Sequence, residues 1–400
     1  MSAAAGFLSD ARARAWRDTK RFMWPSALFV PVLPYVGYGI ASHSGRGIFW
    51  YLTPAIVFIL IPVIDGFVGD DGGNPPEELV AALQEDRYYR WMTFLYLPLQ
   101  YGGLVLGTWV FVQPETTWFA RVGIILSCGT VSGIAINTAH ELGHKREDLE
   151  RWLSKIALAA SWYGHFYVEH NRGHHVRVAT VEDPASARMG ESFYAFWPRT
   201  VWGSLRSAVS LEWKRFRLRG RNPWTIKNDV LNAWLMSLVL YAVLVGFFGP
   251  LALVFLIPQS IIGFSLLEVV NYLEHYGLLR KKNEAGRYEK VNPLHSWNSN
   301  RLATNLFLYE LQRHSDHHAN PTRRYQVLRH FDESPQLPAG YARMIVFALV
   351  PPLWFHSINP LVVQHYGGDL TQANIHPRKR DKILARYATA GPVAGSGSAA

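Results

Sequence analysis

The sequence predicts an all-α polytopic membrane protein, in which six transmembrane helices carry a cytoplasmic, histidine-rich helical cap that holds a dinuclear metal site. Three observations predict this class. The 400 residues are 49% hydrophobic and contain six apolar runs long enough to cross a bilayer. Almost all basic residues lie in the segments on one side of those runs. Nine of the sixteen histidines form four short clusters, and all four clusters belong to that same side.

The six apolar runs each provide about 20 residues, which is enough for a helix across a hydrocarbon core of about 30 Å. Several of them contain proline, which membrane helices tolerate where neighbouring groups satisfy the freed carbonyls. We expect the six spans near residues 23–42, 47–66, 91–112, 118–138, 230–248 and 251–272.

The segment before the first span, residues 1–22, has basic residues but no short apolar region followed by a small-residue cleavage site, so we expect it to be retained. If this segment is cytoplasmic, all but two of the 40 Lys and Arg residues are also cytoplasmic, the exceptions being Arg46 and Arg121. This asymmetry predicts cytoplasmic N- and C-termini in a bacterial inner membrane. The topology and an attraction to anionic lipid explain the net charge of +10, so we expect no nucleic-acid partner.

The spans divide the chain into membrane and cytoplasmic parts. Residues 341–357 are apolar but contain Pro351 and Pro352, which favours an interfacial or re-entrant helix over a further span. The last residues are rich in Gly, Ala and Ser, as flexible linkers are. The predicted parts are a cytoplasmic N-terminal segment at 1–22, transmembrane helices one to four at 23–138, a cytoplasmic His-rich insertion at 139–229, transmembrane helices five and six at 230–272, a cytoplasmic His-rich cap at 273–388 and a flexible tail or linker at 389–400.

The four histidine clusters are the strongest functional signal. Imidazole is the commonest ligand for iron, zinc and copper, and two histidines four residues apart on a helix project from one face. Nine rings exceed what one ion can bind, so we infer two ions that share one pocket. We interpret His165 and His295, near the clusters, as outer or interfacial residues, and Cys128, the single cysteine, as a small buried residue. The candidate ligands are His140 and His144 in HELGH, His170, His174 and His175 in EHNRGHH, His275 in NYLEH, and His314, His317 and His318 in LQRHSDHH.

The first cluster, HELGH, also matches the HExxH pattern of zinc proteases, in which the Glu is a general base. A membrane zinc protease needs this helix and one further ligand, which leaves seven clustered histidines without a role. No Asp-Gly pair that could supply the further ligand follows HELGH within a later span. The zinc protease is therefore an alternative that the other three clusters disfavour.

Each cluster also carries a carboxylate beside a histidine. Metal-bound imidazoles usually donate their second N–H to a carboxylate or a carbonyl, which fixes the tautomer. An ionisable side chain within a span is a further candidate for such a role. For any single acid, pairing with a nearby Lys or Arg is an equally good interpretation. The candidates for these hydrogen bonds are Asp65, Glu141, Glu169, Asn271, Glu274 and Asp316.

Nitrogen-rich ligation without thiolate suits iron that binds dioxygen, so we expect two non-haem iron ions as cofactor and O2 as co-substrate, with copper less favoured. No catalytic side chain is expected beyond the metal centre. A membrane scaffold suggests an apolar substrate that arrives through the bilayer. Residues one or two helical turns from His140 and His275 are candidates for the substrate channel, although packing is the commoner role for any one of them. These candidates are Ser132, Ile136, Phe264, Leu267 and, in addition, Asn271.

The histidine motifs resemble those of the membrane-bound alkane monooxygenases of the AlkB type. The resemblance covers nearly the whole chain, and the HYG string within NYLEHYGLLR discriminates best, because the related acyl-lipid desaturases share the histidine pattern without it. No departure occurs at any of the nine histidines. The matching strings are NTAHELGHK (137–145), EHNRGHH (169–175), NYLEHYGLLR (271–280), LQRHSDHHA (311–319), NPPEE (74–78), RYYR (87–90) and DPASARMGES (183–192).

The resemblance implies a six-helix membrane domain with two non-haem irons that inserts one atom of O2 into the terminal methyl of a medium-chain n-alkane. It also implies that electrons come from NADH through a rubredoxin reductase and rubredoxin. The basic cytoplasmic loops suit an acidic partner of this kind, and we select Arg177, Arg323 and Arg324 as candidate docking residues. An acyl-lipid desaturase or hydroxylase of the same superfamily is the main alternative.

Overall fold

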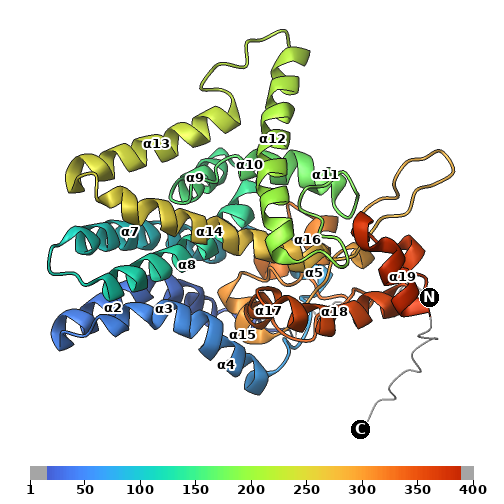
Figure 1. Cartoon of the computed structure of the whole chain (residues 1–400), viewed down its shortest axis with the longest axis horizontal. Coiled ribbons are helices and arrows are strands. Elements are labelled where there is room, and N and C mark those ends of the chain that lie inside the picture. The colour runs from blue at the N-terminus through green and yellow to red at the C-terminus, as the bar shows by residue number, and fades with distance from the viewer. Residues whose placement is uncertain (1–15, 389–400) are drawn as a thin grey trace.

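The computed structural model describes residues 16–388, so the predicted tail at 389–400 and residues 1–15 of the predicted N-terminal segment lie outside the described residues. Within 16–388 the regular structure is helical, with isolated β-bridges and no strand. Long helices lie side by side over one part of the molecule, and shorter helices and loops gather at their ends (Figure 1). The predicted all-α fold with a helical cap is confirmed.

Five helices of the described chain are long and apolar enough to cross a bilayer. The first predicted span, residues 23–42, is not among these five: it forms the 3-10 turn η1 (Trp24–Leu28) and then α2 (Phe29–Ser44), which has only 16 residues. At 1.5 Å per residue α2 is about 24 Å long, which is shorter than a hydrocarbon core of about 30 Å. The five candidate spans are Gly47–Val68, Arg87–Val112, Trp118–Gly143, Asp229–Phe248 and Ala252–His275.

Two of these spans are built from several consecutive elements. In Gly47–Val68, the π-helical turn η3 ends two residues before Pro62, whose missing N–H and bulky ring interrupt the regular hydrogen-bond ladder. The elements of the five spans are η2 (Gly47–Tyr51), α3 (Leu52–Ala55), η3 (Ile56–Leu60) and α4 (Ile61–Val68), then α6 (Arg87–Phe94) and α7 (Tyr96–Val112), then α8 (Trp118–Gly143), α13 (Asp229–Phe248) and α14 (Ala252–His275).

Local sequence explains where the long helices begin and end. The Thr117 side chain accepts a hydrogen bond from the Ala120 N–H at the start of α8, at 3.2 Å. The Asn228 side chain accepts the Val230 N–H at 3.0 Å at the start of α13. Gly249 follows the end of α13 with φ of 79°, a conformation that favours glycine. Capping residues therefore fix the length of these spans.

The helix α8 is the central helix of the bundle and packs closely on α14 (Figure 1). Small residues permit this approach: a Cβ at Gly129 would lie 2.8 Å from the Ile262 side chain, and one at Gly133 would lie 2.7 Å from Leu266. The contact places the ends of α8 and α14, and the histidines there, next to each other.

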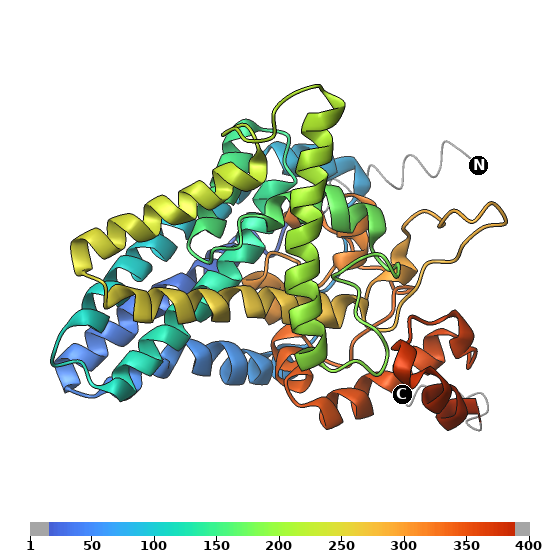
Figure 2. The ribbon, with the colours of Figure 1, turned by 45° about the horizontal axis from the view of Figure 1, so that its top comes forward.

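The cap consists of shorter helices and of α12, which runs across the direction of the spans in both ribbon views (Figures 1 and 2). The apolar segment expected as one interfacial helix forms two helices, α17 and α18, because Pro351 begins a new helix. The cap elements are α5 (Glu77–Glu85), α9 (Asp148–Ala159), α10 (Phe166–Glu169), η4 (His170–His174), α11 (His175–Arg177), α12 (Phe193–Leu218), η5 (Pro293–His295), α15 (Leu302–Phe307), α16 (His314–Ala319), η6 (Tyr325–Val327), α17 (Tyr341–Ala348), α18 (Pro351–His365), η7 (Leu370–Gln372), η8 (Pro377–Lys379) and α19 (Arg380–Ala388).

Candidate metal centre

All nine histidines of the four sequence clusters converge in the structure. They come from the end of α8, from η4 and α11, from the last residue of α14 and from α16. They form two groups, and within each group the candidate ligand atoms lie within 4.8 Å of one another. The first group is His140, His144, His170, His175 and His317, and the second is His174, His275, His314 and His318.

In two pairs of histidines that are adjacent in sequence, one ring belongs to the first group and the other to the second. His174 and His318 belong to the second group, whereas His175 and His317 belong to the first. Successive residues of a helix are rotated by about 100°, so neighbouring rings point in different directions. The ring centroids of His175 and His318 are 4.5 Å apart, closer than the 6.0 Å between His174 and His175. The two groups therefore adjoin, and each HH pair spans the boundary between them.

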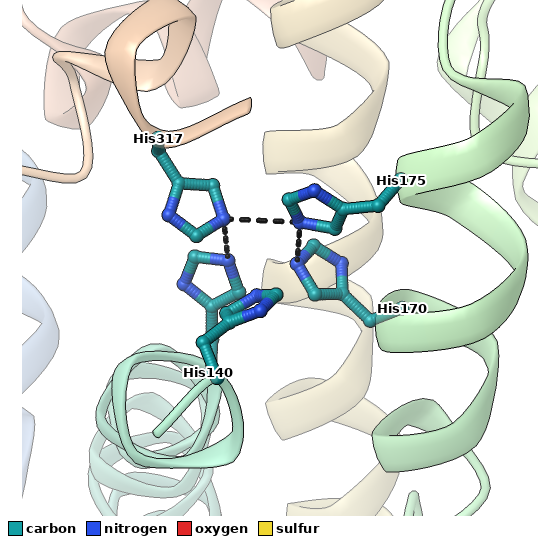
Figure 3. A group of neighbouring side chains, drawn as sticks. His140, His170, His175 and His317 are labelled. Carbon is teal, nitrogen blue, oxygen red and sulfur yellow. Dashed lines mark hydrogen bonds between the residues drawn. The ribbon is translucent and has the colours of Figure 1, made fainter. Parts of the chain in front are cut away.

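The first group has the geometry of a ligand set (Figure 3). The Nε2 atoms of His140 and His317 lie 2.9 Å apart, those of His175 and His170 3.0 Å apart, and those of His175 and His317 3.1 Å apart. Two imidazoles bonded to one metal at about 2.1 Å, at right angles to each other, have nitrogens about 3.0 Å apart. The observed spacing fits this arrangement.

Buried ring nitrogens support the same interpretation. The Nε2 atoms of His144, His174 and His275 are buried and have no hydrogen-bond partner among the described residues. The Nε2 atoms of His314 and His318 face each other at 2.9 Å. A buried polar atom without a partner is costly, and these nitrogens lie together within the two groups, so a metal ion fits them.

Burial also sets the protonation of the rings. Removal from water lowers the pKa of the rings outside the spans well below the ordinary value of 6.5, and neighbouring rings add to this shift. These imidazoles are neutral at pH 7, and the neutral ring is the form that binds a metal. The rings with this lowered pKa are His144, His170, His175, His314, His317 and His318.

Of the acids selected from the sequence, Glu274 contacts a histidine of the centre. Its Oε2 lies 3.2 Å from Nε2 of His314, and its Oε1 has no hydrogen-bond partner in the described chain. Asn271, one turn earlier on α14, donates instead to Glu268, at 3.2 Å. Glu274 is therefore the predicted carboxylate that the structure brings to the candidate ligands.

The other four acids have partners outside the histidine groups, as the alternative interpretation from sequence allows. Glu141, Glu169 and Asp316 each pair with a basic side chain, because a helix turns each acid away from the histidine beside it in sequence. Asp65 has no histidine beside it and accepts a backbone N–H from a distant segment. Glu141 pairs with Lys145 and also accepts a hydrogen bond from the Tyr325 N–H, at 3.2 Å. The pairs are Glu141 with Lys145 at 2.8 Å, Glu169 with Arg177 at 2.6 Å, Asp316 with Arg323 at 2.9 Å, and Asp65 with the backbone N–H of Thr304 at 3.0 Å.

A carboxylate that sequence reasoning missed is Asp183. Its Oδ2 accepts a hydrogen bond from Nδ1 of His174 at 2.9 Å, which orients Nε2 of that ring towards the second group. Burial by itself raises the pKa of Asp183, but the interactions with His174 and Ser186 lower it to about 2. The DPASARMGES string begins with this residue, but its distance along the chain from any histidine concealed the contact.

The three candidate docking arginines also form ion pairs within the chain. Arg177 pairs with Glu169 as described above, and Arg323 with Asp316. Arg324 pairs with Glu147 at 3.0 Å and Glu150 at 3.1 Å. These arginines therefore stabilise the cap instead of forming a free basic surface, contrary to the expectation from sequence.

A narrow apolar cavity leads to the histidines, with about 70 Å³ of open space. Its lining includes His140, His170 and His314 at one end. Most of the remaining lining is apolar and comes from α8, α14, α15, α17 and the span Gly47–Val68. These include Val57, Ile61, Ile134, Leu266, Leu267, Val270, Phe307, Leu308 and Ile345.

Among the channel candidates, Leu267 and Asn271 line this cavity, whereas Ser132, Ile136 and Phe264 do not. On α8 the helical spacing explains the difference. Residues four apart differ in direction about the helix axis by about 400°, so residues at every fourth position drift by about 40° per step. Residues seven apart differ by about 700°, which is close to two full turns, so their side chains point in nearly the same direction. The cavity face of α8 is accordingly Gly133, Asn137 and His140, while the Ser132 hydroxyl donates to Gln259 at 2.9 Å and Phe264 stacks on Tyr163.

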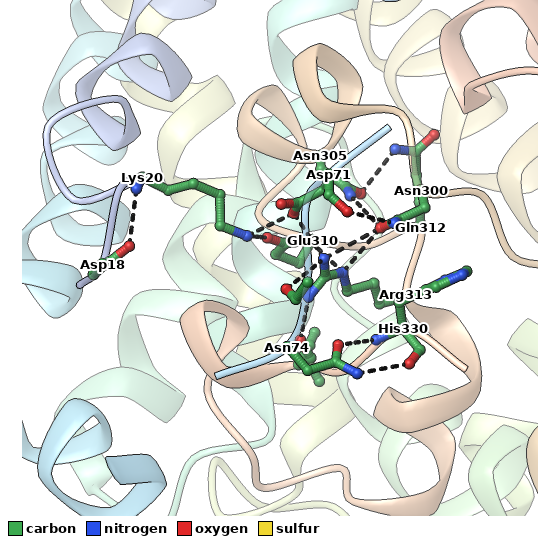
Figure 4. Close-up of polar contacts among 12 residues, drawn as sticks. Asp18, Lys20, Asp71, Asn74, Asn300, Asn305, Glu310, Gln312, Arg313 and His330 are labelled. Atoms are coloured by element: carbon green, nitrogen blue, oxygen red, sulfur yellow. Dashed lines mark hydrogen bonds and ion pairs between the residues drawn. The ribbon is translucent and has the colours of Figure 1, made fainter. Parts of the chain in front are cut away.

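A buried ionic network supports α16 directly before His314 (Figure 4). The Arg313 side chain is fully buried and pairs with Asp71 at 2.7 Å and Glu310 at 2.9 Å. Lys20 pairs with the same two carboxylates, at 2.6 Å from Asp71. Three distant parts of the sequence thereby hold the start of α16 in one position.

Comparison with known proteins gives two results. A family model described as fatty acid desaturase matches residues 116–348, which include all nine histidines. The chain is also similar to curated proteins over nearly its whole length. It is 45% identical to an alkane 1-monooxygenase of Acinetobacter baylyi over 96% of this chain and 95% of the relative. It is 45% identical to an alkane 1-monooxygenase of Pseudomonas putida over 92% of each chain, and 44% identical to alkane 1-monooxygenase 1 of Alcanivorax borkumensis over 96% and 95%.

Proposed function

The chain belongs to the fatty acid desaturase family and, within it, to the alkane 1-monooxygenases, and from this membership we propose that it hydroxylates the terminal methyl of medium-chain n-alkanes to 1-alkanols. O2 is the co-substrate, and rubredoxin, reduced by NADH through its reductase, supplies the electrons. The observation that carries the proposal is the pair of adjoining histidine groups at the end of a narrow apolar cavity.

The proposed cofactor is two non-haem iron ions, one held by each histidine group. The donor set supports iron, since it is rich in neutral nitrogen and contains no thiolate among the described residues. Iron bound there supplies the redox chemistry that lets O2 react with an unactivated C–H bond. The remaining contributions come from the side chains of the protein itself.

The protein selects the terminal carbon by shape. An n-alkane has no polar group, so orientation comes from the apolar walls that guide one chain end towards His140 and His314. The narrow cavity also excludes bulk water from the reacting end. Asn137, which donates to the Leu308 carbonyl at 2.7 Å, and Asn271 are amides in this lining, and they provide hydrogen-bonding groups for the hydroxyl of the product.

The location follows the charge distribution. The helices that can span a bilayer make this an integral membrane protein. We place it in a bacterial inner membrane with the histidine groups on the cytoplasmic side, because the basic residues lie almost entirely on that side of the spans. A soluble rubredoxin can then approach the end of the bundle that carries the metal centre.

The test is product analysis on the purified, iron-loaded protein in membranes given n-octane, NADH, rubredoxin, its reductase and isotopically labelled O2. We expect labelled 1-octanol by gas chromatography with mass detection, and none when rubredoxin is omitted. Labelled octanol with another reduced donor but not with rubredoxin would overturn the partner and keep the reaction.

The same assay addresses the acyl-lipid alternative. Membranes of the same composition without octane, with acyl lipid as the substrate, form the second arm. Absence of octanol together with desaturated or hydroxylated acyl chains would replace the alkane by an acyl lipid as the substrate.

A further inference from the structure

A basic hollow lies at the end of α12, away from the histidine groups. It has a volume of about 490 Å³ and lies where α12 passes into the loop 219–228 that leads to α13. Four basic side chains line it, together with Phe216: Arg215, Arg219, Arg221 and Lys227. The hollow is separate from the metal centre and has no role in the reaction described above.

Most of the basic side chains of this hollow form no ion pair with a carboxylate of the described residues. Arg215 pairs with Glu212 at 2.6 Å, and this acid also pairs with Arg172. Arg219, Arg221 and Lys227 are exposed, and within residues 16–388 none of the three has a carboxylate partner. The hollow therefore has an uncompensated positive charge that favours an anion.

The loop that closes the hollow is ordered by its own hydrogen bonds. The Arg221 N–H donates to the Phe216 carbonyl at 3.0 Å, and Nη2 of Arg215 donates to the Lys227 carbonyl at 3.1 Å. The Asn228 side chain donates to the Pro223 carbonyl at 3.1 Å. The basic groups are therefore presented on a fixed frame, which reduces the entropy lost on binding.

Exposed apolar side chains surround the basic groups. Leu218 is 78% exposed, Trp224 71% and Ile226 73%. Large apolar side chains beside Arg and Lys are typical of segments that lie at the boundary between lipid headgroups and acyl chains. A free phosphate or nucleotide would leave these side chains in water.

The position of α12 fits a membrane surface. In both ribbon views α12 runs across the spans, and its end and the following loop project past the neighbouring helices (Figures 1 and 2). The candidate span α13 begins at Asp229, directly after this loop. When the spans cross the bilayer, the hollow lies at headgroup level on the side of the histidine groups.

We propose that this hollow binds the phosphate headgroup of an anionic phospholipid, with Arg219, Arg221 and Lys227 on the phosphate and Trp224 and Ile226 in the upper acyl region. The contact anchors the end of α12 in the leaflet. It adds a lipid-binding site to the protein and is independent of the substrate that the metal centre oxidises.

The experiment is native mass spectrometry of the iron-loaded protein in detergent, titrated with phosphatidylglycerol or phosphatidylcholine. We expect one tightly bound phosphatidylglycerol, and weakening on the order of 100-fold in the triple variant Arg219→Gln, Arg221→Gln, Lys227→Gln. The matched control is Lys281→Gln, Lys282→Gln, Arg287→Gln, three exposed basic residues of another loop, which removes equal charge and should keep the tight site. Equal affinity for both lipids, or equal loss in both variants, overturns the proposal.

Two further arms separate the sources of an anion. The Trp224→Ser, Ile226→Ser variant should weaken phosphatidylglycerol and leave the weak binding of inorganic phosphate unchanged. Phosphate that displaces the lipid at equal concentration overturns the lipid assignment. If the triple variant loses binding of an acidic soluble protein but keeps phosphatidylglycerol, the hollow is a protein-docking surface and the proposal fails.

Discussion

At the scale of single residues, the candidate metal centre depends on the direction of each ring. His317 lies at Nε2 distances of 2.9 Å from His140 and 3.1 Å from His175, so it joins rings from three elements. His165 is also buried, and both of its nitrogens lack a partner among the described residues, but it belongs to neither group. The contrast between His317 and His165 shows that burial alone does not place a histidine among the candidate ligands.

We predict that His317→Ala removes metal from the first group and lowers octanol formation by at least about 100-fold, because a ligand is lost. Metal analysis per chain and the octane assay measure this. The control, His165→Ala, should keep the metal content. Equal metal loss in both variants would show that the effect arises from packing instead of ligation.

A second residue-scale prediction concerns Asp183, which orients His174. We expect Asp183→Asn to weaken metal retention by about 10-fold to 100-fold, since the charged acceptor of the ring N–H is lost. Competition with a chelator measures the retention. The neighbouring Glu182→Gln is the control, because Glu182 is exposed and accepts a hydrogen bond from Tyr288 at 2.8 Å. Equal retention by wild type and Asp183→Asn would remove Asp183 from the centre.

At the scale of the elements, contact between α8 and α14 determines whether their histidines meet. Gly129 has no room for a side chain, with Ile262 at 2.8 Å and the Gln259 carbonyl at 3.1 Å from a Cβ there. Gly246, on α13, has nothing within 4 Å of such a Cβ. The two helical glycines thus differ in packing and not in local secondary structure.

We predict that Gly129→Ala destabilises the protein by about 1–3 kcal/mol, because the added methyl separates the two helices. Thermal unfolding in detergent measures this change. Gly246→Ala should be neutral or more stable by up to about 1 kcal/mol, because alanine is the better helix former. An unchanged unfolding temperature for Gly129→Ala would mean that the two helices adjust without cost.

At the scale of the whole molecule, many neutral buried rings make stability depend on pH. Burial lowers the pKa of His144, His170 and His175, and of the three histidines of α16, below the value of about 6.5 in an unfolded chain. Below that pH the unfolded chain therefore binds more protons than the folded chain. Glu169 and Glu310 act in the opposite direction, since burial raises the pKa of each, that of Glu169 to about 7, but they are two groups against six.

We predict that the metal-depleted protein has its full stability above about pH 6.5 and loses stability as pH falls towards 5. Thermal unfolding at several pH values, with and without a chelator, tests this. Metal-loaded protein should lose stability at a lower pH, because bound metal competes with protons for the rings. Metal-depleted protein that gains stability from pH 7 to 5 would contradict the prediction.

Local patterns in the sequence determined the class of the fold and the candidate ligands. Apolar runs and helix caps act over a few residues, so the spans could be predicted, apart from α2, which is shorter than expected. The spacing of the histidines depends on helical geometry, which is also local. For this reason the set of nine histidines that converge could be identified from the sequence.

Tertiary structure alone decided how these residues are combined. It divided His174 from His175, brought Asp183 to His174, paired Glu141 with Lys145 and turned residues 133, 137 and 140 of α8 towards the cavity. Each of these outcomes depends on the rotation of a helix about its axis or on contact between distant segments. Packing of the whole chain sets both, because a rotation of one helix changes every contact that it makes.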